Sequence, residues 1–431
     1  MTLPLDGIRV LDLGVALAGP QGAAYLADLG AEVIRVESTQ HFPPLTRGPQ
    51  ARPTLDLVRR LPPVSGGYPD RDPGVRPWNR HPWFNLTARN KLSMTVDLER
   101  PVGLEMFRRL VAISDVLVTN QAPSKLEKLG LGWEDLRAVN PRLSYIEATS
   151  FGSRGPFKHY RAMGHQMEAF SGHDSLRHRR GGDATSNSWV VAADAAGSAG
   201  IALAALMALY ARTESGLGQY VDVAMVESFV GLLGHHVLDF TVNGHVPTSM
   251  GNRDYSALQG CYRCRGDDRW VVITVCTDEQ WVALCGALGH GEYDEDPRFL
   301  TAQARHENHD TADELLSSWL AERDRDGVVD LLRAAGIQAG PVLDDADAHA
   351  DEHLRARGYF LEISQRDTGT YRYPGFPYRF TENTLTVRHP PCMLGEHNEY
   401  VYKELLGVTD DEYARLERDG HIGTEYAPHI Q

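Results

Sequence analysis

The chain has 431 residues, with 43 Lys and Arg against 58 Asp and Glu, so its formal net charge is −15 at pH 7. This acidic balance argues against a protein that binds nucleic acid or an anionic membrane surface through its charge. At about 150 residues per domain the length predicts two or three domains. Five cysteines and a start without a basic region or a long apolar run indicate a cytoplasmic protein.

The first 149 residues alternate between the periodicities of strand and helix. Residues 8–13 form an expected strand, 20–29 a helix closed by Gly30, and 33–36 a second strand. The pattern recurs with strands at 93–98, 116–118 and 143–149 and helices at 103–113 and 124–129. Strands that alternate with helices predict an α/β fold with a parallel sheet covered on both faces.

Two segments in this half depart from the alternation. Residues 41–82 hold ten of the 24 prolines and show no sustained period, which predicts a long irregular loop. Residues 195–211 are almost uncharged and rich in alanine and leucine. Because a membrane-spanning helix needs about 20 mainly apolar residues, this shorter segment predicts a helix buried in a protein core.

The second half predicts a smaller lobe. A strand at 219–225 is followed by an apolar stripe at 226–242 that can join two lobes, and a new unit begins near Gly251. Its expected elements are a strand at 270–275 and helices at 279–288, 313–321 and 328–335, in an α/β or α+β arrangement. The aromatic tail from residue 359 predicts strands that pack on another part of the protein.

Two familiar motifs are present only in part. The turn from Gly14 to Gly19 joins the first strand to the first helix, and Glu37 lies where a ribose-binding acid would, but the G-x-G-x-x-G spacing of a dinucleotide site is missing. A tight turn that only leads the chain into the first helix is therefore favoured over an NAD-binding turn. Cys261 and Cys264 have no second pair at metal spacing, so no metal site is predicted.

Asp194 and His165 are the candidate reactive groups. Asp194 precedes the alanine-rich helix, where an aspartate is a preferred N-cap, and local sequence alone favours that role. The same position suits a carboxylate nucleophile, because a helix N-terminus keeps it ionised and Gly197 and Gly200 allow a ligand to come close. His165 is a candidate general base if a substrate places an acidic C–H group next to a carbonyl within its reach.

Several segments together resemble the class III CoA-transferase family, also called the CaiB/BaiF or formyl-CoA transferase family. They include LDGIRVLDLGVALAGPQGAAYLADLGAEVIRVE, ARNKLSMTVDL, YRAMGHQMEAFSG, ADAAGSAGIALAALMALYARTESGLGQYVDVAMVES, GIQAGPV and LGEHNEYV. The resemblance runs in order along nearly the whole chain. It implies a large Rossmann-like CoA-binding domain at 1–228, a linker helix and smaller α/β domain at 229–345, and a segment at 346–431 that returns to the large domain. It also implies an interlocked homodimer, with a heteromer as the other possibility.

The resemblance implies that Asp194 is the nucleophile. It would attack an acyl-CoA, possibly succinyl-CoA, and pass through an aspartyl anhydride and an aspartyl-CoA thioester before a carboxylic acid accepts the CoA. No metal and no cofactor beyond coenzyme A or acyl-CoA is needed.

The resemblance also implies a set of CoA contacts. They fall in the first strand–helix turn, an N-K motif, the segment after the third β-strand of the family pattern, and the helix that follows it. The matching residues are Val15, Ala16, Leu17, Asn90, Lys91, Asn120, Gln121, Lys128 and Leu129. Some members carry glutamine at the position of Leu17 and arginine at that of Ser38, which leaves the acyl group open. Arg253, near the closest counterpart of the family's glycine-rich flap, is a candidate for a substrate carboxylate.

Three other functions remain to be weighed. The family includes α-methylacyl-CoA racemases, in which a His/Asp pair moves an α-proton, so His165 and Asp194 are also compatible with isomerisation. The sequence motif around His165 is closer to that of the transferases than to that of the racemases, which favours CoA transfer. A non-catalytic CoA-binding subunit of a heteromer is disfavoured by Asp194 itself. An NAD-dependent α/β enzyme leaves most of the matching segments unexplained.

Overall fold

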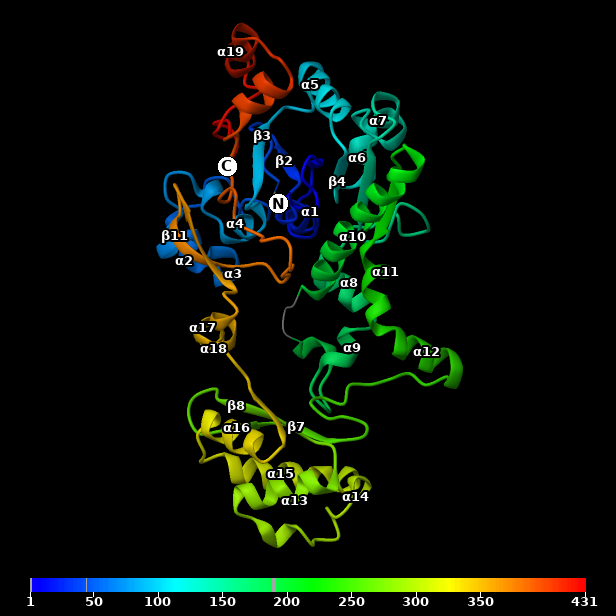
Figure 1. The fold of residues 1–431 in the computed structure, drawn as a ribbon, viewed down its shortest axis with the longest axis vertical. Coiled ribbons are helices and arrows are strands. Elements are labelled where there is room, and N and C mark those ends of the chain that lie inside the picture. Colours follow the sequence, from blue (N-terminus) through cyan, green and yellow to red (C-terminus); the bar gives the residue numbers. More distant parts are fainter. Residues whose placement is uncertain (1, 44, 188–190) are drawn as a thin grey trace. The chain divides into compact units, whose positions relative to one another are not determined.

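The computed structural model describes residues 2–43, 45–187 and 191–431, which form two compact units (Figure 1). Unit 1 comprises Met1–Ser171, Trp189–Leu238 and Gly358–Gln431, and unit 2 comprises Gly172–Ser188 and Asp239–Arg357. The chain leaves unit 1 after Leu238 and returns to it at Gly358, whereas the family resemblance implied boundaries at 228–229 and 345–346. The excursion of 172–188 into unit 2 was not predicted, because that segment carries no periodic apolar pattern.

Unit 1 is built on a six-stranded parallel sheet with the strand order β3-β2-β1-β4-β5-β6. The strands are β1 (Arg9–Asp12), β2 (Glu32–Glu37), β3 (Lys91–Thr95), β4 (Val116–Thr119), β5 (Ser144–Thr149) and β6 (Tyr220–Ala224). The predicted α/β fold with a parallel sheet is therefore confirmed. In this doubly wound order the strand sequence reverses between β1 and β4, and ligands bind at the carboxyl ends of the strands beside such a switch point.

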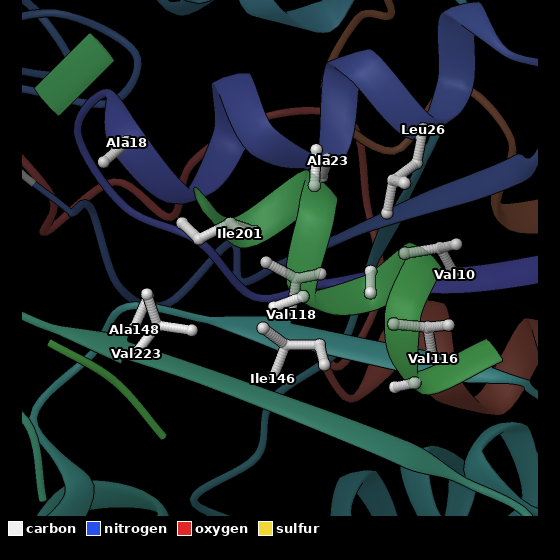
Figure 2. Packing of buried hydrophobic residues seen from close by; sticks show 14 of the residues in the cluster. Val10, Ala18, Ala23, Leu26, Val116, Val118, Ile146, Ala148, Ile201 and Val223 are labelled. Carbon is white, nitrogen blue, oxygen red and sulfur yellow. The ribbon is translucent and has the colours of Figure 1, made fainter. Parts of the chain in front are cut away.

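The two faces of the sheet belong to two hydrophobic cores, because successive strand residues point to opposite faces. Val10 and Val118 face one core, and their neighbours Leu11 and Leu117 face the other. Helices α1 (Ala18–Asp28) and α10 (Ala192–Ser215) cover the first face, and Figure 2 shows Ile201 of α10 between α1 and the strands. Helices α5 (Pro101–Ala112) and α7 (Trp133–Val139) contribute to the second core.

Helix α10 is longer than predicted and ends at Gly216, which has a left-handed φ of 72°. It lies so close to α1 that a Cβ on Gly22 would come within 2.6 Å of the Ile201 side chain. Among the described residues it is the one helix long and apolar enough to cross a membrane by length and composition. The helix packs on α1 and the sheet, as the sequence predicted for a helix of the protein core.

The segment 41–82 is not the irregular loop that its prolines predicted. It contains α2 (Leu55–Arg60), α3 (Pro63–Gly66) and two short 3₁₀ turns, and α4 (Pro82–Ala88) follows. Its order comes from distant partners, because Asp367 accepts hydrogen bonds from Arg76 and Asn79 and pairs with the Arg76 guanidinium. Such contacts leave no local sequence signal.

Asp367 lies in the turn of a hairpin formed by β10 (Phe360–Gln365) and β11 (Gly369–Pro374). The strands expected in the aromatic tail are therefore present up to Pro374, whereas residues 375–380 form no strand. Beyond the hairpin, a π-helical turn at Tyr400–Leu405 and helix α19 (Asp410–Arg418) supply Tyr402 and Leu416 to the second core of the sheet. The other helices of unit 1 are α6 (Pro123–Lys128), α8 (Gly164–Phe170) and α11 (Met225–Val230).

Unit 2 has a three-stranded antiparallel sheet with its own hydrophobic core. Its strands are β7 (Leu258–Arg263), β8 (Trp270–Val275) and β9 (Gln338–Pro341), and its helices are α9 (Asp174–Arg177), α13 (Asp278–Leu288), α14 (Ala302–Glu307), α15 (His309–Leu320), α16 (Arg325–Ala334), α17 (Asp345–Ala350) and α18 (Glu352–Ala356). Helix α12 (Gly234–Asn243) carries the chain into this unit, as the apolar stripe predicted. The arrangement is α+β.

Candidate functional site

A cavity of about 250 Å³ lies in unit 1 where β1, β4 and β5 end. The turn after β1 supplies three lining residues, β4 is followed by Asn120, and Ala148 belongs to β5 itself. The described lining residues are Val15, Ala16, Leu17, Leu45, Gly48, Pro49, Ser65, His81, Trp83, Asn120, Ala148, Ser150, Ala162, Met163, Gly164, His165, Val191, Asp194 and Met225. The cavity therefore occupies the switch point at which a doubly wound sheet binds its ligand.

Asp194 is the third residue of α10 rather than its N-cap, a position that Val191 holds without a side-chain hydrogen bond. The prediction of a capping role is therefore wrong. The backbone N–H of Gly164, the first residue of α8, donates a hydrogen bond to the Asp194 carboxylate. A Cβ at position 164 would collide with Asp194 Oδ2, so this close approach requires glycine.

The surroundings of Asp194 disfavour its charge. Burial raises the pKa of its carboxyl group to about 6, and the nearby Glu168 carboxylate adds to the rise. The Gly164 hydrogen bond and His165 oppose it. The group is still mainly ionised at pH 7, yet more basic than an ordinary aspartate, and this combination suits a nucleophile or a base.

The turn after β1 is held open by side chains from the end of β4. Asn120 Oδ1 accepts from the Val15 N–H at 2.6 Å and Asn120 Nδ2 donates to the Val15 carbonyl at 3.0 Å. Gln121 Nε2 donates to the carbonyl of Leu13. Ala16 has a φ of 55°, and its N–H donates to Thr46 Oγ1. Asn120 and Gln121, expected to contact CoA, thus use these atoms to shape the turn that faces the cavity.

A second cavity of about 180 Å³ is lined by the first part of this turn and shares Val15 with the first cavity. The ends of β1 and β2, residues 96–99 after β3 and one face of α6 complete its lining. Gln121 and Leu129 line this cavity, and the lysine in its lining is Lys125, whereas Lys128 is exposed outside the lining. Because Lys125 and Leu129 are four residues apart, they lie on the same side of the helix.

The N-K motif at Asn90 and Lys91 is structural in this conformation. Lys91 is 1% exposed, and its ammonium donates to Asp12 at 2.8 Å and to the carbonyl of Pro20 at 2.6 Å. Asn90 has a φ of 59° and binds Asp28 and the backbone of Arg388. Both side chains therefore link the sheet, α1 and the C-terminal segment, and a CoA contact from either of them stays a prediction.

His165 lines the cavity next to Asp194, as the sequence suggested. Arg253 belongs to unit 2, where its guanidinium pairs with Asp310 and Asp313. The sequence analysis missed the cavity residues Leu45, Gly48, Pro49, Ser65, His81 and Trp83, since they come from or adjoin the segment taken as a loop.

A doubly wound sheet with a cavity at its switch point, lined by a partly buried carboxylate near a helix N-terminus, is the arrangement of an α/β protein that binds its ligand at this edge of the sheet. The sequence profile of CoA-transferase family III matches residues 5–398, and the chain belongs to this family. It is an enzyme of the CoA-transferase class, and the resemblance recognised from the sequence is confirmed.

Known proteins resemble the chain over most of its length. The succinyl-CoA–D-citramalate CoA-transferase of Chloroflexus aurantiacus is 32% identical over 96% of this chain and 97% of its own length. The beta subunit of succinyl-CoA–L-malate CoA-transferase from the same organism is 30% identical over 95% of this chain and 96% of its own. The crystal structure of a CaiB/BaiF family protein from Brucella suis matches with a TM-score of 0.81 at 30% identity, covering 94% of this chain and 100% of that chain.

The raised pKa of Asp194 predicts a pH-dependent effect of Asp194→Asn on stability. The folded pKa of about 6 lies above the ordinary aspartate pKa of 3.8, so between these pH values the folded state holds a proton that the unfolded state releases, and stability is lost as pH rises from about 4 to 6. Asparagine removes this loss. We expect the variant's gain in the free energy of unfolding to grow by about 1 kcal/mol between pH 5 and pH 8.

Urea denaturation followed by tryptophan fluorescence measures this gain at each pH. Glu168→Gln is the companion variant, because it removes one of the two causes that raise the Asp194 pKa. The gain from Asp194→Asn should then be smaller in the Glu168→Gln background. A gain that is the same at pH 5 and pH 8 would contradict the assignment of a raised pKa.

Proposed function

We propose that this enzyme transfers CoA from succinyl-CoA to a carboxylic acid, with Asp194 as the nucleophile. The observation that carries the proposal is the position of Asp194, which lines a small cavity at the switch point and is partly withdrawn from water while remaining ionised at neutral pH. The two similar enzymes from Chloroflexus aurantiacus are named as CoA-transferases that use succinyl-CoA, which supports succinyl-CoA as the donor.

The reaction needs four substitutions at acyl carbons. The Asp194 carboxylate attacks the thioester carbonyl, the C–S bond breaks, and CoA thiolate leaves an aspartyl–succinyl anhydride. The thiolate then attacks the aspartyl carbon of the anhydride, which releases succinate and forms an aspartyl-CoA thioester. The acceptor carboxylate attacks this thioester to form a new anhydride and thiolate, and the thiolate takes the acceptor's acyl group. Asp194 is regenerated as a carboxylate.

The cavity supports this chemistry in two ways. The Gly164 N–H and the first turn of α10 place hydrogen-bond donors and the positive end of a helix dipole beside Asp194, where oxyanions would form. Apolar side chains such as Leu45, Trp83 and Met225 make up much of the lining. A water-poor lining protects the anhydrides from hydrolysis, so the energy of the thioester is kept for the acceptor.

We propose that the second cavity takes the nucleotide portion of CoA. It adjoins the first cavity through Val15, as a substrate that reaches from its nucleotide to its thioester requires. Lys125 supplies a positive charge to its lining, and lysine binds phosphate as a point charge. His41, also in the lining, has its pKa lowered by burial and by Lys125.

A hydroxylamine trapping experiment tests the nucleophile. Purified enzyme incubated with succinyl-CoA and hydroxylamine should gain a hydroxamate at Asp194, because hydroxylamine attacks the activated aspartyl carbon. Peptide mass spectrometry locates the modification. Asp194→Asn should abolish both the hydroxamate and CoA transfer, lowering kcat by at least about 10³-fold.

Glu227→Gln is the matched control, since Glu227 is an exposed carboxylate in the neighbouring helix α11 and should leave trapping unchanged. The racemase function predicts a different result. No trapped adduct with any acyl-CoA, together with exchange of the α-proton in deuterated water, would replace transfer by His165-dependent isomerisation.

Two lysines of the same helix test the place of the nucleotide. Lys125→Ala should raise the KM for acyl-CoA by about tenfold, the size of a lost hydrogen bond to a charged group. Lys128→Ala is the matched control and should change this KM little, because Lys128 lies outside the cavity lining. Steady-state kinetics at low salt measures both values. A larger effect from Lys128 would restore the original sequence prediction and contradict this one.

We further propose that the enzyme is a homodimer, with the interlocking that the family resemblance implied. One side of α10 carries an apolar stripe of Leu203, Met207 and Tyr210, which are 57%, 55% and 75% exposed. Their spacing of four and three residues places them together on the helix, and a second chain can cover them.

Light scattering should therefore give twice the chain mass of 47.8 kDa. Met207→Asp should shift the protein toward monomer, because it places a charge in the covered stripe. Val75→Asp serves as the control, since Val75 is a single apolar residue that is 94% exposed and lies outside the stripe. A monomer at micromolar concentration in the unmodified protein would contradict the proposal.

A further inference from the structure

A third cavity, of about 340 Å³, lies in unit 1 and takes no part in the proposed transfer reaction. Tyr145 and Glu147 of β5 line it, whereas Ala148 of the same strand lines the Asp194 cavity. Because successive strand residues point to opposite faces, the two cavities lie on opposite faces of the sheet at β5. Helices α6 and α7, strand β6 and the loop after β5 supply the rest of the lining.

The buried part of the third cavity holds a carboxylate without a cationic partner among the described residues. Glu147 is 5% exposed, and its Oε2 atom accepts a hydrogen bond from Tyr220 Oη at 2.7 Å. Asp222 lies beside it in the register of β5 and β6 and is bound to Ser153 instead. Burial raises the pKa of the Glu147 carboxyl group, the Tyr220 hydrogen bond opposes this rise, and Asp222 and Glu127 add to it. A hydrogen-bond donor from a ligand would stabilise this carboxylate.

Three aromatic rings line the cavity next to Glu147. The rings of Trp133, Tyr145 and Tyr220 have centroids 5.8 to 6.4 Å apart. The Tyr145 hydroxyl donates to the carbonyl of Leu131 at 3.4 Å and the Tyr220 hydroxyl donates to Glu147, so both hydroxyl groups have acceptors in the protein. This aromatic wall suits a flat, unsaturated ring, because nucleobases stack on the rings of such side chains.

The loop after β5 brings the opposite charge to the same cavity. Residues 151–163 contain two arginines, a lysine and a histidine but no Asp or Glu, in a chain with a net charge of −15. Arg154, Lys158 and His159 line the cavity, and their exposed side chains form no hydrogen bond or ion pair with the described residues. Their donors are therefore free to bind an anionic group of a ligand.

The order of these features defines the ligand. A donor is needed at the buried carboxylate, a flat ring along the aromatic wall and an anion at the exposed cations. The cavity volume lies within the range of about 300–1,000 Å³ that is typical of sites for small organic ligands. We propose that the third cavity binds a mononucleotide whose base carries an amino group, with the amino group on Glu147 and the phosphate on Arg154 and Lys158.

CoA contains an adenine nucleotide, so two sources of this chemistry have to be separated. The second cavity, which we assigned to the nucleotide portion of CoA, shares no described lining residue with the third. We therefore assign the third cavity to a free nucleotide that binds at the same time as CoA. The assignment does not depend on whether Asp194 is the nucleophile.

Isothermal titration calorimetry of the full-length enzyme with three related ligands tests the site. AMP should bind with the same affinity in the absence and in the presence of saturating CoA. IMP carries a carbonyl oxygen in place of the amino group and should bind roughly tenfold more weakly, because two acceptors then face each other at Glu147. Adenosine lacks the phosphate and should also bind roughly tenfold more weakly, because it loses the charge-assisted hydrogen bonds.

Two variants divide the site into its two ends. Glu147→Gln keeps an acceptor for Tyr220 and gains an N–H that can donate to the IMP carbonyl, so the ratio of AMP to IMP affinity should fall to about one. Lys158→Ala should weaken AMP but leave adenosine unchanged. Arg161→Ala is the matched control, because Arg161 is an exposed cation of the same loop outside the cavity lining, and it should leave all three affinities unchanged.

Three results overturn the proposal. No AMP binding at millimolar concentration excludes the site, and equal affinities for AMP and IMP in the unmodified enzyme exclude the contact with Glu147. Displacement of AMP by CoA, together with weaker AMP binding in Lys125→Ala, places AMP in the second cavity instead. Because Lys158 is exposed, Lys158→Ala should fold normally, so the proposal stays falsifiable even if Glu147→Gln does not fold. Failure of hydroxamate trapping at Asp194 contradicts the transfer reaction and leaves this inference standing.

Discussion

The buried ion pair between Glu37 and Arg47 fixes the part of unit 1 on which the cavity depends. Arg47 is fully buried, and its guanidinium donates to both Glu37 carboxylate oxygens, at 2.7 and 2.6 Å, and to the carbonyl of Trp78. It also lies over the Phe84 ring, 3.6 Å from the centroid. Removing one partner of such a pair is unfavourable by about 3–5 kcal/mol, because the other charge stays buried. The pair therefore ties the end of β2 to the segments that carry Gly48 and His81.

The side of the cavity next to α1 and α10 depends on small residues. Gly22 lets α10 lie directly on α1. A Cβ on Gly19 would lie 2.6 Å from Asn120 Oδ1, so the absence of a side chain there lets the start of α1 approach Asn120. Both helices therefore begin close to the carboxyl edge of the sheet. Asp194 reaches the cavity because α10 starts there, and Gly164 leaves room for its carboxylate. A larger side chain at any of these glycines would therefore displace Asp194 from its position in the cavity.

The sequence predicted what local periodicity encodes and missed what distant contacts decide. Strand 270–275 and helix 20–29 carry their apolar pattern within a few residues, and the structure places β8 and α1 there. Asp194 was singled out by family resemblance, since its local pattern is that of a cap. No local signal separates Lys91, buried against Asp12, from Lys125 at a cavity. The segment 41–82 is ordered by Glu37 and Asp367, which lie outside it in the sequence.

Asp194 and His81 are also where the fold departs from what stability alone would favour. Burial raises the pKa of the Asp194 carboxyl group and lowers that of the His81 imidazole, so each group loses hydration. Natural proteins keep such unfavourable groups mainly at functional sites, where a ligand supplies the missing interaction. In the proposed transfer reaction, the acyl group that forms a bond to Asp194 removes the charge of this carboxylate, so the reaction itself relieves the unfavourable burial.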